Sequence, residues 1–353
     1  MRYALVYSAL VAGASAHGLI TSIEGANGVS MPGLSVADGT PRDCSSNRCG
    51  SQADTSIIRN RDMKASPLGR TQGNGPVDPA TMIKAFMGGG ANSVPTNTAA
   101  KGVGQEDDLS GLKGAAQRRE EHRRQIDQLF GGLLGGAGGA KDANGAGGAA
   151  GGRGGLGGLL GGVGGGAGGI GGLLGGGGGT KNNFAKETMV ADTAGQGATK
   201  GLPTSSDNGE VSMVFRQINQ DGAGPLTAAI DGTSGGSDAS AFKNAKVTQD
   251  VPGLGIQGLS LATNTEFPVK VQMPQGMTCE GKVGGADNVC IVRVRNGAAA
   301  GPFGGSAAFT QSPAARKRAI AYRLRKRFEI SRPSEAEEIA AADAAEQEED
   351  EDE

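Results

Sequence analysis

The sequence is poor in aromatic residues. Its 353 residues include no tryptophan, three tyrosines and nine phenylalanines. The tyrosines Tyr3, Tyr7 and Tyr322 all lie near the ends of the chain, so we expect phenylalanine to be the only ring of the folded core. Because carbohydrate-binding platforms use tryptophan or tyrosine faces, such a core would offer no stacking surface for sugars.

Histidines and long apolar runs are also scarce. With two histidines in the whole chain, a Ser-His-Asp or Cys-His arrangement would have to use His122. The glycine runs end in no Gly-Lys-Ser/Thr, which excludes a phosphate-binding loop. No stretch of about 20 apolar residues is present, so no membrane span is expected. A formal charge of -2 gives no reason to expect a nucleic-acid partner.

The first sixteen residues, MRYALVYSALVAGASA, have the pattern of a secretory signal. A basic Arg2 precedes a short apolar stretch, and small residues at Ala14 and Ala16 predict cleavage after Ala16. We therefore expect an exported protein whose mature chain begins with His17.

The composition then divides the chain into four further zones. Residues 131–179 contain 29 glycines and almost no large side chain, so they have too little apolar surface to offset the entropy cost of ordering. A basic stretch at residues 315–329 predicts a helix, and an acidic run at residues 335–353 with eleven carboxylates follows it, a combination typical of a solvated tail. The expected organisation is residues 17–100 and 183–312 as two parts of one domain, residues 101–182 as a low-complexity insert, and residues 313–353 as a tail.

Short apolar runs separated by turn residues predict strands at residues 211–218, 267–273 and 290–296, with another at 306–312. In the second run, Phe267, Val269, Val271 and Met273 alternate with polar residues and should share one face. Since no amphipathic helix is evident between these runs, the pattern favours a mostly β fold, an antiparallel β-sandwich of immunoglobulin-like type.

The four cysteines predict two disulfides, as expected for an exported chain. Four cysteines allow three pairings, and we favour Cys44–Cys49 with Cys279–Cys290, because the second pair brackets a glycine-rich hairpin loop. A metal site is disfavoured, since neither a CxxC spacing nor a neighbouring histidine is present.

His17 is the one candidate metal ligand. Once signal cleavage exposes its α-amine, that amine and Nδ1 can chelate Cu(II). We favour the simpler interpretation, in which His17 is only the residue at which the signal ends and has no role as a copper ligand. A complete copper site would need a second histidine, and His122 lies in the charged segment QRREEHRRQ beside the glycine-rich run.

Glycoside hydrolysis requires a pair of carboxylic acids, but the sequence does not indicate which two residues would form it. Asp and Glu residues in turn segments mostly serve to form the turn. The candidates are Glu24, Asp38, Asp54, Asp62, Asp78, Glu210, Asp221 and Asp231.

Several long segments resemble the fungal Egh-type family of secreted virulence factors, also described as Gas-type or appressorium-specific. They are HGLI, QADTSIIRNRDM, SPLGRTQGNGPVDPA, FRQINQDGAGPLTAAID, VTQDVPGLGIQGLS, FPVKVQMPQGMTCEG and NVCIVRVRNGAAAGPFGGSAAFTQS. The resemblance implies an extracellular location and expression around host penetration or surface growth. The closing segment also looks like the last strands of lytic polysaccharide monooxygenases, which implies a sandwich.

From the same resemblance we expect a histidine in relatives at the position of Arg216. An arginine stays protonated and cannot coordinate copper, so this departure disfavours oxidase chemistry. The expected function is therefore that of a secreted, non-catalytic factor at the cell wall or host surface, with cell-wall polysaccharide or the host surface as the expected partner. The alternative is a copper-dependent oxidoreductase acting on polysaccharide through His17.

Overall fold

The structure is a computed structural model that describes ten stretches of the chain. These are residues 17–45, 50–89, 94–97, 179–181, 184–220, 222–253, 258, 260, 262–298 and 301–331. The predicted signal at residues 1–16, the glycine-rich run up to residue 178 and the acidic run lie outside the described residues, as do Cys49, His122 and Asp221.

Strands account for most of the regular structure. They are β1 Gly18–Glu24, β2 Ser30–Pro32, β3 Ser56–Ile57, β4 Arg70–Thr71, β5 Gly75–Pro76, β6 Thr180–Lys181, β7 Glu210–Gln217, β8 Thr227–Asp231, β9 Phe242–Gln249, β10 Thr265–Gln272, β11 Gly281–Val283, β12 Ala286–Arg295 and β13 Phe303–Phe309. The helices are α1 Pro79–Phe86, α4 Met189–Thr193, α5 Gly197–Lys200 and α6 Pro313–Ser331, with short 3-10 turns at Asn60–Asp62 and Ala239–Ala241.

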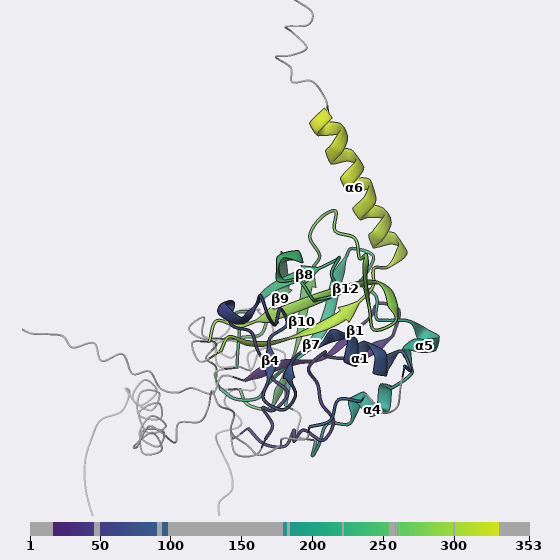
Figure 1. Ribbon diagram of the computed structural model, residues 1–353. Coiled ribbons are helices and arrows are strands. Elements are labelled where there is room, and N and C mark those ends of the chain that lie inside the picture. The colour runs from purple at the N-terminus through teal and green to yellow at the C-terminus, as the bar shows by residue number, and fades with distance from the viewer. Residues whose placement is uncertain are drawn as a thin grey trace, which may run out of the picture.

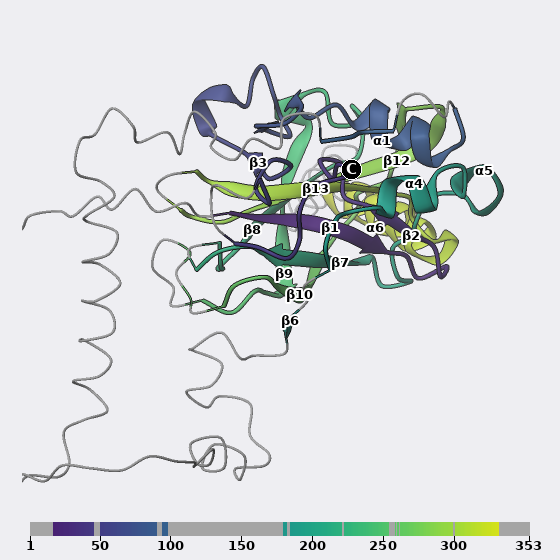
Figure 2. The same ribbon diagram turned by 90° about the horizontal axis from the view of Figure 1, so that it is seen from below.

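The strands form one curled antiparallel sheet. Its hydrogen-bonded order is β2-β1-β7-β10-β9-β8-β12-β13-β3-β4-β5, with β11 beside β12 and β6 beside β10. The sheet bends into a half-barrel, so that β1 lies against β13 although no ladder joins them (Figure 2). Glycine permits this approach, because a Cβ at Gly305 would lie 2.6 Å from the backbone nitrogen of Ile20.

The core fills the inside of the curl, and its composition follows from strand alternation. On β10, Phe267, Val269 and Val271 are buried while the residues between them are partly or fully exposed, as predicted. On β12 the residues of both faces are buried, because the strand lies in the middle of the sheet between β8 and β13.

The mostly β, antiparallel character predicted from the sequence is confirmed. The finer expectation of an immunoglobulin-like sandwich stays a prediction. A sandwich consists of two separate sheets, whereas here β9 pairs with both β10 and β8 and so joins all the strands in a single hydrogen-bonded path. Between β7 and β13 the described residues contain a 3-10 turn but no α-helix, in line with the sequence pattern. The sequence did not predict the helices α1, α4 and α5, which precede β7 and lie together beside one end of the sheet (Figures 1 and 2). Helix α1 begins with Asp78 as N-cap and Pro79 in its first turn, which is a usual helix start.

Helix α6 matches the predicted basic helix but is anchored to the body rather than free. Ser312 caps its start, since the Ala315 backbone nitrogen donates to Ser312 Oγ at 3.1 Å. Ala315 and Ala319 are buried against the body, and the rest of the helix projects away from the sheet (Figure 1). Within the part of the chain that the structure covers, no helix is apolar over enough residues to cross a bilayer.

A disulfide joins Cys279 to Cys290, with their Cα atoms 4.9 Å apart. Between the two cysteines, β11 pairs with β12 through a turn at Gly284 and Gly285, both with positive φ. Cys44 is also disulfide-bonded, and Cys49, its predicted partner, lies outside the described residues.

We expect the double substitution Cys279→Ala and Cys290→Ala to lower the free energy of unfolding by about 3 kcal/mol, because the disulfide restricts the unfolded chain. Urea denaturation of both proteins measures the difference. Lys282→Ala, in the same hairpin, is the control. Its ion pair with Asp287 is exposed on both sides, so the midpoint should hardly move. An equal loss in both variants would contradict the assignment to the disulfide.

Candidate functional site

His17 lies immediately before β1 and extends its pairing with β7. The backbone carbonyl of His17 accepts from the Ile218 nitrogen at 2.9 Å, and its backbone nitrogen donates to Asn219 Oδ1 at 2.6 Å. The imidazole packs on the Phe303 ring, with ring centroids 4.5 Å apart. The residue is fully buried, so the sheet fixes its position on both the backbone and the ring side.

Arg216 lies on β7, opposite Leu19 of β1. Its side chain is fully buried; Nη1 is 3.1 Å from Glu266 Oε1, and Nη2 donates to the carbonyl of Arg42. The guanidinium also lies 5.4 Å from the Phe184 ring centroid. Burial, with Arg42 nearby, lowers the pKa of Arg216, yet an arginine remains a cation near neutral pH.

The described residues do not fit a complete copper site. An N-terminal His17 would offer its amine and Nδ1, but the guanidinium of Arg216 cannot act as a further ligand. No group of three or more His, Cys, Asp or Glu side chains that could hold a metal is found among the described residues. His122 lies outside them, so the structure brings no second histidine to His17.

A buried cluster of charges surrounds Arg42 beside this region. The sequence did not predict it. Arg42 has no exposed surface; Nη2 is 2.5 Å from Asp54 Oδ2, and Nε is 2.9 Å from Glu187 Oε2. Asp54 also accepts a bond from the Ala37 backbone nitrogen at 3.2 Å. Through its carbonyl, Arg42 holds Arg216, so the cluster continues onto β7.

The charges in this cluster stabilise one another. Burial alone would lower the pKa of Arg42, but the carboxylates of Asp54 and Glu187 raise it above its ordinary value. Arg42 therefore keeps its proton, and each carboxylate is paired instead of being left alone in a nonpolar interior. Glu187 and Arg42 lie on opposite sides of the predicted insert, so the cluster binds these two parts of the chain together.

Several of the acidic residues considered for glycoside chemistry make structural hydrogen bonds. Asp38 accepts from the Val190 and Ala191 nitrogens at the start of α4, and Asp231 accepts from three backbone nitrogens of the loop after β8. Burial alone would raise the pKa of Asp231, but a hydrogen bond from the Ser234 hydroxyl, together with these backbone bonds, lowers it. The expectation that acidic residues mostly form turns therefore fits Asp38, Asp78 and Asp231.

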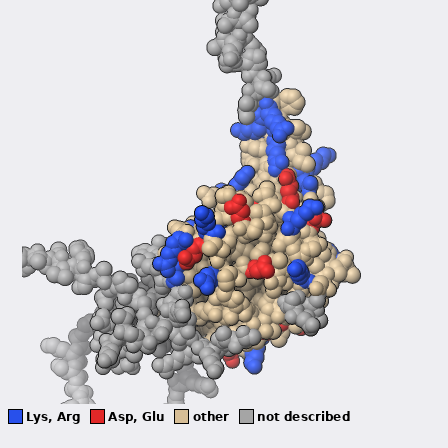
Figure 3. Space-filling model, in the orientation of Figure 1, with Lys and Arg blue, Asp and Glu red and all other residues tan. Residues whose placement is uncertain are grey.

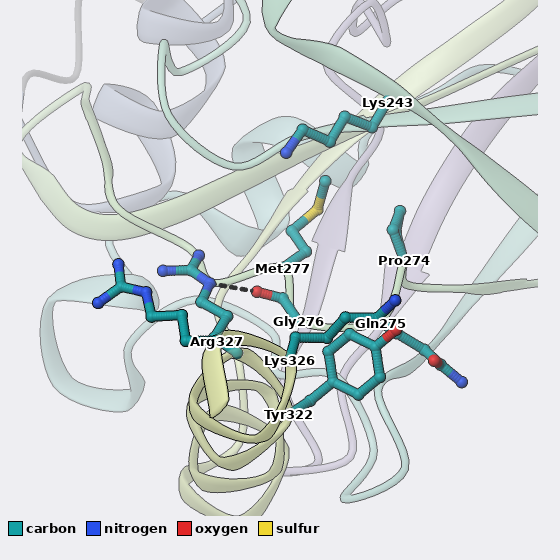
Figure 4. A pocket seen from close by; sticks show the side chains of 9 residues that line it. Lys243, Pro274, Gln275, Gly276, Met277, Tyr322, Lys326 and Arg327 are labelled. Atoms are coloured by element: carbon teal, nitrogen blue, oxygen red, sulfur yellow. Dashed lines mark hydrogen bonds between the residues drawn. The ribbon is translucent and has the colours of Figure 1, made fainter. Parts of the chain in front are cut away.

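A basic groove of about 350 Å³ lies between α6, the start of β9 and the loop after β10 (Figure 4). Its lining consists of Lys243, Pro274, Gln275, Gly276, Met277, Tyr322, Arg323, Lys326 and Arg327. Arg323 fixes one wall, since Nε donates to the Gly276 carbonyl at 2.6 Å and Nη2 to Thr278 Oγ1 at 2.5 Å. Lys and Arg side chains continue from here along the projecting helix (Figure 3).

The groove changes the sequence-based view of Tyr322. This tyrosine was expected to lie in a solvated tail, but its ring lies over Gly276, where a Cβ would come within 2.9 Å of it. Gly276 has a φ of +77°, so glycine suits both the turn and the contact. The one sequence signal was the spacing of Ala315, Ala319 and Tyr322, which places them on one side of a helix. One ring beside several cations suits a polar ligand with negative or hydroxyl groups.

Comparison with known proteins identifies relatives along most of the chain. Residues 15–304 match the family described as Egh16-like virulence factor. The chain is 47% identical over 315 residues to the appressoria-specific virulence factor GAS2 of Pyricularia oryzae, covering 88% of this chain and 89% of that protein. It is 37% identical over 139 residues to the appressoria-specific virulence factor GAS1 of the same fungus, covering 38% of this chain and 52% of that protein. No solved structure matches the chain.

We expect Arg42→Met to lower the free energy of unfolding by about 3–5 kcal/mol, because it leaves Asp54 and Glu187 as unpaired buried carboxylates. Chemical denaturation monitored by circular dichroism measures the loss. The matched control is Arg61→Met, whose side chain is 75% exposed and whose pair with Asp62 should contribute little. Similar stabilities for the two variants would show that the Arg42 cluster does not hold the fold.

Proposed function

Because this chain belongs to the family of Egh16-like virulence factors, we propose that it is an exported factor that acts outside the cell during host penetration or surface growth. The observation that carries the proposal is the 47% identity, over 88% of the chain, to a relative named as an appressoria-specific virulence factor. Family membership was expected from the sequence segments, and the comparisons agree with that expectation.

Two features of the chain support export. The signal-like pattern ends at Ala16, and β1 begins at Gly18, so cleavage at the expected position would leave every described strand intact. The Cys279–Cys290 disulfide is a type of bond that forms and persists in oxidising compartments.

The factor acts by binding, and its ligand is cell-wall polysaccharide. The basic groove supplies a tyrosine ring together with Lys243, Lys326 and Arg327, which can donate hydrogen bonds to hydroxyl and carboxylate groups of a sugar. No described carboxylate forms an ion pair with these three cations, so they remain available to a ligand. Catalysis is not required, since Asp38, Asp54 and Asp231 are already used in caps and pairs.

We expect the protein to sediment with insoluble chitin, β-glucan or polygalacturonate, and Tyr322→Ala to weaken that binding about tenfold, as for other buried aromatic contacts with a ligand. Depletion of the protein from the supernatant at increasing polysaccharide concentration measures the affinity. Lys326→Gln should weaken binding as well, whereas Lys64→Gln makes the same charge change at an exposed site away from the groove. Absence of binding to all three polysaccharides would overturn the polysaccharide assignment.

A second candidate function rests on His17 and on the expected, unconfirmed likeness of the closing strands to those of lytic polysaccharide monooxygenases. In this alternative, the freed amine and the imidazole of His17 would chelate Cu(II), which promotes oxidative chemistry on polysaccharide when bound. The amine would remain beside Asn219, which accepts from this nitrogen at 2.6 Å. Arg216, with its fixed positive charge on the neighbouring strand, makes this the weaker candidate.

If the binding function is right, processed protein titrated with Cu(II) will show only weak association. Electron paramagnetic resonance of the titrated protein and of His17→Ala tests this. A tight one-to-one signal that disappears in His17→Ala would establish the copper alternative. Protein that keeps residues 1–16 is the control, because its His17 nitrogen is an amide and cannot form the chelate.

A further inference from the structure

The cations of the basic groove come from two of its walls. Lys243 lies at the start of β9, whereas Lys326 and Arg327 lie on α6 (Figure 4). All three side chains are exposed. Within the described part of the chain, no carboxylate forms an ion pair with any of them. A ligand in the groove therefore meets uncompensated positive charge on both sides.

Helix α6 extends this positive charge beyond the groove. Arg316, Arg323 and Arg327 are separated by seven and four residues, which places them along one side of the helix. Arg316 donates to the neutral Asn288 Oδ1 at 2.8 Å and so keeps its net charge. The pair of Arg323 with Glu280, at 3.6 Å and half-exposed on both sides, neutralises little. The cations thus form a row along the projecting helix (Figure 3).

The groove offers little aromatic surface beside these cations. Tyr322 is the single ring among the residues that line it, and this ring is half-buried over Gly276. A neutral sugar chain presents ring faces and hydroxyl groups, so its binding would depend largely on this one ring. A sugar that carries a carboxylate also forms charge-assisted hydrogen bonds with lysine and arginine, which are roughly twice as strong as neutral ones. The lining therefore favours an acidic sugar chain.

Taking the groove as the binding site of the proposed function, we propose that its ligand is a polyuronate, a polysaccharide with a carboxylate on each sugar. A row of separate cations matches repeated single charges better than one compact phosphate, on which bidentate arginines would converge at a single point. The groove, of about 350 Å³, holds a short part of the chain, and the further cations of α6 bind the sugars that follow. Tyr322 and the aliphatic stem of Lys326, one turn apart on α6, contact the sugar rings.

Calorimetric titration of the whole chain with two forms of one polymer tests this proposal. The first is polygalacturonate, and the second is the same polymer after complete methyl esterification, which removes the charge and keeps the sugar backbone. We expect the acid form to bind at least about tenfold more tightly at low ionic strength. Salt at about 1 M should remove most of this difference, because the cations of the groove are exposed.

Variants on the two walls assign the preference to the groove. Lys243→Gln and Lys326→Gln should each weaken polygalacturonate binding about threefold and narrow the difference between acid and ester. Lys317→Gln is the matched control, since it makes the same change on the same helix. Its position nine residues before Lys326 places it on the opposite side of α6, so both affinities should stay the same. All three side chains are exposed, and unchanged thermal unfolding will confirm that the variants fold.

Equal or tighter binding of the ester, of chitin or of β-glucan would overturn the polyuronate assignment and leave the binding of wall polysaccharide in place. Absence of binding to every polysaccharide would overturn both. Equal binding of poly-L-glutamate would show a surface that attracts any polyanion, and it would also overturn the assignment. So would tighter binding to vesicles containing phosphatidylserine, which would assign the groove to a membrane surface. An effect of Lys317→Gln as large as that of Lys326→Gln would place the binding outside the groove and contradict the proposal.

Discussion

Arg42 is buried without any exposed surface, and the fold therefore depends on the two carboxylates that pair with it. Asp54 comes from the same part of the chain, but Glu187 comes from beyond the predicted insert, 145 positions away. A buried guanidinium that lost one partner would leave an uncompensated charge, so both parts must be in place for the native state to form. The insert can vary in length or composition at little cost as long as its ends still bring Glu187 to Arg42.

The same cluster connects the structural scaffold to the region around His17. Arg216 is held by Glu266 and by the Arg42 carbonyl, and it stands across the sheet ladder from β1. The strand β1, which directly follows the candidate copper ligand His17, thus lies beside the permanent positive charge of Arg216. The basic groove lies elsewhere, between α6 and the loop after β10, so the two candidate sites do not share residues and can be tested separately.

The sequence predicted those strands and helices that depend on the residues of one short segment. Alternation at Phe267, Val269 and Val271 identified a strand with one buried face, and the basic run identified α6 as a helix. The curl of the sheet was not predictable, because it depends on a close approach of β1 to β13 at Gly305 that leaves no periodic pattern. The Arg42 cluster was missed for the same reason, since its partners are 12 and 145 positions away. The groove was missed because Tyr322 was assigned to a solvated tail.

The pairing of β1 with β7 also has a consequence during synthesis. His17 and its hydrogen-bond partner Asn219 are 202 positions apart, so the first strand waits until more than half of the chain has been made. At typical elongation rates this takes about 10–40 s, during which β1 cannot pair with β7. The strand order thus postpones the completion of the sheet until β7 has been made.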